Sequence, residues 1–267
     1  MTPEGKRRWA PALALTPLLA LLLGNDPAMG ALFLGLAAPA AVGLTRRSVR
    51  AQVFAQGVVC FLLVEGAEIA VDGISYSPLY FLQGLAMMLA SGLALALAWP
   101  SLGSSEARAS FAPVAYREWF LVGAIACVAA TLESFWQSML AQIFNDPFNH
   151  WTLLCWGLSA TFLAGAWGIL RMRAWGVLLG GLSALVALAA AAYSGMASAT
   201  VFAMAAAPAL ALGFPLAASR WRARPPRSQP VRVSAAAASV ASPREVERAE
   251  DEVPDGEEPS SMRRHAR

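Results

Sequence analysis

Acidic side chains inside an apolar stretch are the residues of this sequence whose type and spacing could do chemistry. Glu65 and Glu68 lie in the apolar stretch 51–71, and Asp72 follows it directly. At about 100° per residue in a helix, the three carboxyl groups fall within about 60° of one another. Gln56, in the same stretch, projects from the opposite face. The spacing therefore predicts one acidic face on one helix.

A second apolar stretch, 119–143, carries Glu133, and Gln137 follows it by one helical turn on the same face. At 1.5 Å per residue, Glu65 and Glu133 each lie about 21 Å from the starts of their helices. If both helices run in the same direction, the two acids share a depth. We expect these side chains to form one acidic cluster.

A carboxylate near the centre of a bilayer costs about 2.5–3.5 kcal/mol, so it usually faces other helices and has a partner. No Lys or Arg lies inside any apolar stretch. Three states remain open for these acids: they are protonated, they bind a cation, or they hydrogen-bond to neutral polar groups and join helices. Close carboxyl groups in a low dielectric favour the retention of at least one proton near neutral pH.

Composition places these acids in a membrane. Hydrophobic residues make up 57% of the chain and charged residues 14%, against roughly 45–50% and 25% in soluble domains. A helix needs about 17–25 apolar residues to span a bilayer. Eight stretches approach or reach this length: Trp9–Gly24, Ala28–Leu44, Ala51–Val71, Leu79–Trp99, Trp119–Ile143, Trp151–Leu170, Ala174–Tyr193 and Ala197–Ser219.

Basic residues mark every second link between these stretches, and the remaining links hold none. Cytoplasmic loops carry the excess of Lys and Arg in membrane proteins. The sequence therefore predicts an all-α integral membrane protein, a polytopic bundle of about eight transmembrane helices with both termini in the cytoplasm, in a bacterial-type cytoplasmic (inner) membrane. The residues that mark the cytoplasmic side are Lys6, Arg7, Arg8, Arg46, Arg47, Arg50, Arg108, Arg117, Arg171, Arg173, Arg220, Arg222, Arg224 and Arg227.

The composition changes at Arg220 to Arg, Pro, Ser, Ala and Glu. We expect two parts: a helical bundle over residues 1–219 and a disordered cytoplasmic tail over residues 220–267. Arg220, Arg222 and Arg224 should lie against anionic lipid headgroups. The basic residues have a topological cause, so they do not indicate nucleic-acid binding.

Small residues are spaced for close helix contact in two places. Ala31 and Gly35 lie four residues apart in the second stretch, and Gly176 and Gly180 lie four apart in the seventh. In lipid, such pairs let helix backbones approach closely. We expect both pairs to pack inside the bundle.

No enzyme signature is present: the sequence has no HExxH, GxSxG, CxxC or P-loop motif, and no catalytic residue can be named. His150, at the start of the sixth stretch, is a weak candidate metal ligand beside the carboxylates. No cofactor can be named.

Three functions stay open. The first is a small permease-like or proton- or cation-coupled transport protein that uses Glu65, Glu68, Glu133, Asp72 and Gln137. The second is a non-catalytic sensor or assembly component that acts through its tail. The third is an intramembrane metal-dependent hydrolase. The lipid bilayer is the expected partner, and a homo-oligomer or a protein partner stays open.

Overall fold

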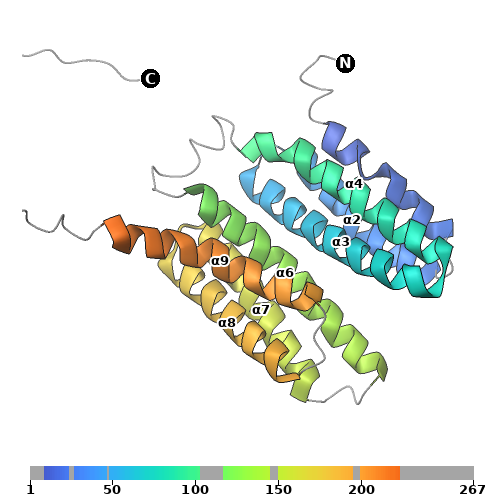
Figure 1. Cartoon of the computed structure of the whole chain (residues 1–267). Helices are drawn as coiled ribbons and strands as arrows, with labels where there is room; N and C mark the ends of the chain where they lie inside the picture. The colour runs from blue at the N-terminus through green and yellow to red at the C-terminus, as the bar shows by residue number, and fades with distance from the viewer. Residues whose placement is uncertain are drawn as a thin grey trace, which may run out of the picture. The chain divides into compact units, whose positions relative to one another are not determined.

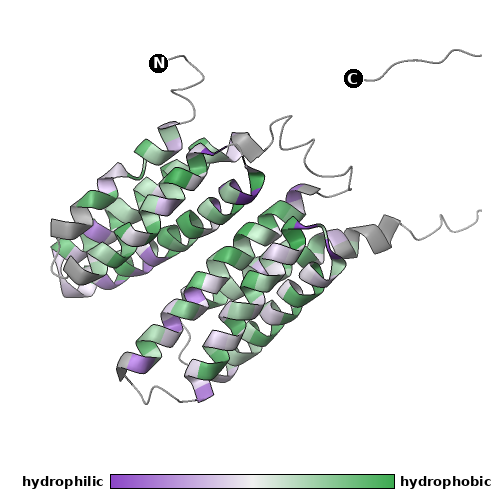
Figure 2. Cartoon of the chain, turned by 180° about the vertical axis from the view of Figure 1, so that it is seen from behind, coloured by the Kyte–Doolittle hydropathy of each residue, from purple (hydrophilic) through white to green (hydrophobic). Residues whose placement is uncertain are grey.

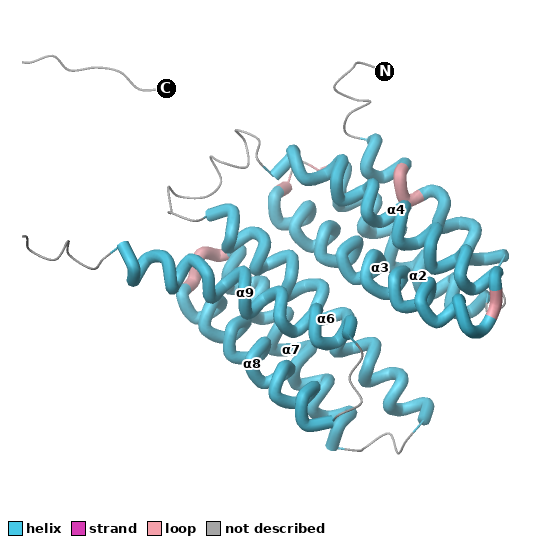
Figure 3. Tube along the Cα trace, in the orientation of Figure 1, coloured by secondary structure: helices cyan, strands magenta, loops and turns pink. Residues whose placement is uncertain are grey.

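The computed structural model describes residues 9–23, 27–46, 48–102, 117–144, 150–194 and 199–222. Within these ranges every regular element is a helix (Figure 3). The predicted all-α class is confirmed for this part of the chain. In order, the elements are η1 (Thr16–Leu23), α2 (Pro27–Thr45), α3 (Val49–Tyr76), α4 (Pro78–Leu102), α6 (Arg117–Phe144), α7 (His150–Leu170), α8 (Ala174–Ser194) and α9 (Ala199–Arg222) (Figure 1).

Five of the described helices are long and apolar enough to cross a membrane. They are Val49–Tyr76, Pro78–Pro100, Glu118–Gln142, His150–Leu170 and Ala174–Tyr193. Three shorter apolar helices occupy Trp9–Leu19, Met29–Thr45 and Ala199–Pro215. Five apolar helices and the absence of strands in the described ranges fit a helical membrane protein.

Large apolar side chains face outward on α4 and α8, where seven leucines, named at the end of this paragraph, are 42–69% exposed. Their spacing of three, four or seven residues gathers them on one face of each helix. Figure 2 shows that hydrophobic residues occupy most of the length of the helices. Stripes of this kind are unfavourable in water and favourable against lipid chains. The stripes are Leu82, Leu89, Leu93 and Leu97 on α4, and Leu178, Leu182 and Leu185 on α8.

Glycines bring consecutive helices into backbone contact. A Cβ atom at Gly73 of α3 would overlap the backbone of Phe81 in α4, and one at Gly84 would overlap that of Ala70. As residue numbers rise on α3 they fall on α4, so the two helices are antiparallel. Close approach through small residues is the usual way to join helices in lipid.

The pair α7 and α8 follows the same rule. A Cβ atom at Gly165 would lie 3.0 Å from the Cα of Gly180, and one at Gly168 would lie 2.6 Å from the Cα of Gly176. The predicted packing of Gly176 and Gly180 is therefore confirmed. Gly35, by contrast, has nothing within 4 Å of its Cβ position, so the packing predicted there was wrong for the described chain.

Basic residues from two links meet at one end of the helices. The guanidinium carbon of Arg171 lies 4.7 Å from the ring centroid of Trp167 in α7, and that of Arg50, at the start of α3, lies 5.6 Å from it. Both distances suit cation–π contact. The start of α3 and the end of α7 therefore lie at the same end of the helices.

The first apolar stretch departs from the single helix predicted over Trp9–Gly24. Residues 9–13 are α-helical, a turn follows, and η1 then runs as a 3₁₀ helix over Thr16–Leu23. Pro17 explains the break, because proline has no N–H and its ring collides with the carbonyl of Leu13 in an α-helix. The hydroxyl of Thr16 instead donates to the Leu13 carbonyl at 2.7 Å.

Candidate functional site

A close, parallel contact between α3 and α6 positions the candidate site. A Cβ atom at Gly57 of α3 would lie 2.5 Å from the Cβ of Val128 in α6. Further along both helices, in the same direction, Glu65 meets Glu133. The missing side chain at Gly57 lets the two backbones approach, and this approach brings the two acids together.

The carboxyl groups of Glu65 and Glu133 lie within hydrogen-bonding reach of each other. Both side chains are buried, with exposures of 4% and 3%. Two carboxylate oxygens repel at this distance, and a hydrogen bond between them needs a proton. The geometry therefore fits a pair that shares at least one proton.

Neighbouring polar groups supply hydrogen bonds to only some of the carboxyl oxygens of this pair. The side-chain amide of Gln137 donates to Oε1 of Glu133 at 2.9 Å. Oε1 of Glu65 and Oε2 of Glu133 are buried and have no hydrogen-bond partner. Unpartnered buried oxygens are costly, so they mark places where a proton or a small ligand would be stabilised.

Glu68 lies one helical turn beyond Glu65 and is half-buried. Its Oε2 accepts a hydrogen bond from the hydroxyl of Thr200 at the start of α9. Asp72, one further turn along α3, is exposed. Burial of the acids thus decreases along α3 from Glu65 to Asp72.

The contribution of Thr200 was missed by the sequence reasoning. A threonine near the start of an Ala-rich stretch is ordinary in a membrane helix, and nothing in the local sequence indicates its partner. Only the packing of α9 against α3 and α6 brings it to Glu68. The pairing joins residues 132 positions apart.

Other buried polar atoms also lack hydrogen-bond partners. Gln56 is fully buried, and neither atom of its amide group has a partner; the hydroxyls of Ser91 and Thr152 are likewise unpartnered. Gln56 lies about 13.5 Å from Glu65 along α3 and on the opposite face, as predicted from the helical period. Gln56 therefore does not extend the acidic site.

His150 is the first residue of α7 and is exposed. Within the described ranges, no three His, Cys, Asp or Glu side chains gather in a way that could hold a metal ion. A structural or catalytic metal needs several ligands at fixed distances. What the acid pair can do chemically is to hold, share and release a proton.

No protein-family model, curated protein or solved structure matches the chain.

Proposed function

We propose that the protein is a small, permease-like, proton-coupled membrane protein and that Glu65 and Glu133 form its proton site. The observation that carries the proposal is the buried carboxyl pair, in which each acid retains one oxygen without a partner. Buried ionisable residues within membrane helices commonly mark proton or ion pathways. Gln137 orients Glu133 within this site.

A proton suits the pair better than a metal cation does. Two unpartnered oxygens are available, whereas divalent cations such as Ca²⁺ take about six to eight oxygen ligands. The carboxyl groups also lie close enough to share a hydrogen. A proton needs no further ligand.

Access to the pair is proposed from the outer side of the membrane, through Asp72 and Glu68. This direction follows from a topology of eight spans with both termini in the cytoplasm, in a bacterial-type inner membrane. The basic residues of the links support that topology, since Arg50 and Arg171 share the ring of Trp167. The outward decrease in burial along α3 supports the route.

Cysteine labelling tests the topology. In a variant without the natural cysteines, single cysteines at the exposed Ser75 or at Pro147 should react with a membrane-impermeant maleimide added outside the cell. Cysteines at Ser104 or Ser242 should react only after the membrane is opened. External labelling at Ser242 would contradict the proposed orientation.

A pH jump on proteoliposomes tests the proton site without knowledge of the substrate. On a solid-supported membrane, proton binding to the wild-type chain should give a transient current. The current should disappear in Glu65→Gln and in Glu133→Gln. It should persist in Glu118→Gln, which removes an exposed acid at the start of α6. Equal currents in all four proteins, or none in the wild type, would overturn the proposal.

A further inference from the structure

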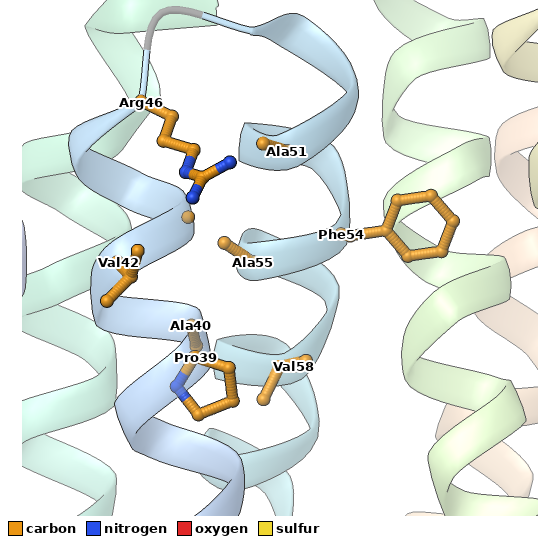
Figure 4. A pocket seen from close by; sticks show the side chains of 9 residues that line it. Pro39, Ala40, Val42, Arg46, Ala51, Phe54, Ala55 and Val58 are labelled. Carbon is orange, nitrogen blue, oxygen red and sulfur yellow. The ribbon is translucent and has the colours of Figure 1, made fainter.

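An apolar groove lies between α2 and α3, near the end where basic residues gather, and it is separate from the acid pair. Its walls are Pro39, Ala40 and Gly43 from α2, and Ala51, Ala55 and Val58 from α3. Its volume is about 490 Å³. Figure 4 shows these side chains lining the space between the two helices.

Small side chains create the groove. A Cβ atom at Gly43 would lie 2.8 Å from that of Ala55, so the two helices approach closely at the floor of the groove. Val42 stands at the rim and is 53% exposed, which leaves the groove open along its length. In a bilayer such an opening is filled by a lipid chain, because an empty apolar furrow loses van der Waals contacts.

Arg46 closes one end of the groove with a positive charge. Its backbone is held in place, because its N–H donates to the Gly43 carbonyl at 3.2 Å and its own carbonyl accepts from the Gln52 side chain at 2.8 Å. Its side chain is exposed and extends across the end of the groove toward α3 (Figure 4). No carboxylate of the described residues pairs with this guanidinium group.

We propose that this groove binds one anionic phospholipid, with an acyl chain between α2 and α3 and the phosphate on Arg46. From Arg46 to Pro39 the groove runs about 10 Å along α2, enough for part of an acyl chain. Arginine matches a phosphate with two parallel hydrogen bonds. Apolar walls with one well-placed polar group are the usual composition of a ligand site.

The charge of Arg46 and its position at the end of α2 together favour an anionic phospholipid as the occupant of the groove. Arg46 lies directly after the last residue of α2, at the level of Arg50 and Trp167, where headgroups meet the helix ends. A neutral apolar segment of another protein would leave the guanidinium group unpaired. A phosphodiester with its chain in the groove satisfies both features.

Binding of short-chain lipids to the purified full chain in neutral detergent tests the proposal. Dioctanoyl phosphatidylglycerol is compared with dioctanoyl phosphatidylcholine and with inorganic phosphate, by native mass spectrometry and by the shift in melting temperature. The phosphatidylglycerol should bind about fivefold more tightly than the phosphatidylcholine, as one basic contact near the surface provides. Inorganic phosphate should give no comparable shift, because it has no chain for the groove.

Substitutions distinguish the contribution of the Arg46 charge from that of the apolar groove. Arg46→Gln should abolish the preference for phosphatidylglycerol, whereas Arg173→Gln, which removes an exposed charge from the α7–α8 link, should keep it. Ala51→Leu should weaken the binding of both lipids, because the larger side chain fills the groove. Val42→Asn, at an exposed rim position, gives a second way to weaken chain binding if Ala51→Leu does not fold.

Three results would overturn the proposal. The first is an equal loss of preference in Arg46→Gln and Arg173→Gln, which would indicate general surface charge. The second is full lipid binding in the folded groove variants. The third is a shift with inorganic phosphate that equals the shift with phosphatidylglycerol, which would indicate an anion site without a lipid chain.

Discussion

The α7–α8 and α3–α6 contacts both form at glycines, but only the α3–α6 contact contains a pair of buried acids. Both depend on glycines that let backbones approach, at Gly168 and Gly176 in one pair and at Gly57 in the other. The α7–α8 contact is built from small residues, whereas the α3–α6 contact also buries the Glu65–Glu133 pair. Close glycine contacts therefore occur both with and without a buried acid pair, and substitutions can separate what the glycines contribute from what the acids contribute.

The largest effect is expected where the backbones are closest. In Gly176→Leu the side chain would collide with the backbone of Gly168 and Ile169, which cannot move aside. We expect a loss of about 3 kcal/mol in the free energy of unfolding. The melting temperature in detergent would measure it.

Gly181→Leu is the matched control, because it lies on the same helix and its Cβ position has nothing within 4 Å. This variant should stay within about 0.5 kcal/mol of wild type. If both variants melt alike, the backbone contact does not hold α7 and α8 together.

A smaller loss is expected when one acid of the pair becomes apolar. Glu65→Leu would leave the Glu133 carboxyl without its proton-sharing partner, at a cost of about 1–3 kcal/mol. Glu65→Gln keeps the size and the hydrogen-bonding capacity, and should be neutral or mildly stabilising. Chemical unfolding in mixed micelles would compare the two. Equal destabilisation by Leu and Gln would show that the acid has a structural role that an amide cannot fill.

Removal of the hydrogen bond between α9 and α3 should cause a smaller loss of stability again. Thr200→Val removes the hydroxyl that donates to Glu68 and should cost about 1 kcal/mol. Thr161→Val removes only a bond to the Leu158 carbonyl within the same helix and should cost less. Thermal unfolding of both variants would measure the difference. A larger loss of stability for Thr161→Val than for Thr200→Val would contradict a stabilising hydrogen bond between Thr200 and Glu68.

The smallest effect is expected from the tail. Truncation after Pro230 removes polar sequence outside the predicted bundle and should change the melting temperature by less than about 1 °C. The truncated chain should also keep the proton-dependent current. If the bundle stays folded but the current is lost, the alternative in which the tail carries the function would replace the transport proposal.

Long apolar runs made most of the described helices predictable to within about five residues, although the first stretch is broken after residue 13. The third stretch was predicted over Ala51–Val71, and the structure has it as α3, Val49–Tyr76. The helix is longer than the apolar run because Asp72 and the residues after it continue the helix. The meeting of Glu65 and Glu133 was predictable from the helical rise together with a common direction for the two helices.

Contacts between distant helices were not predictable in this way. The pairing of Glu68 with Thr200 depends on how α9 packs, and the spacing of Ala31 and Gly35 resembled that of Gly176 and Gly180 although Gly35 faces open space. A small-residue pair shows that a helix can be approached, but the neighbour that approaches it depends on the arrangement of the whole bundle. The proposed roles of the acids remain predictions.

Infrared difference spectroscopy during a pH titration tests the central claim most directly, because a protonated carboxyl group has a carbonyl band that a carboxylate lacks. In the folded wild type, that band should decrease as the pH rises from about 5 to 8, when the shared proton leaves Glu65 and Glu133. Since the folded pair binds a proton that the unfolded chain has released, the melting temperature should fall over the same range. Glu65→Gln and Glu133→Gln should each alter the band, while Glu118→Gln should leave it as in wild type. A band that is absent from the wild type, or unchanged in both Gln variants, would contradict a shared, exchangeable proton on this pair.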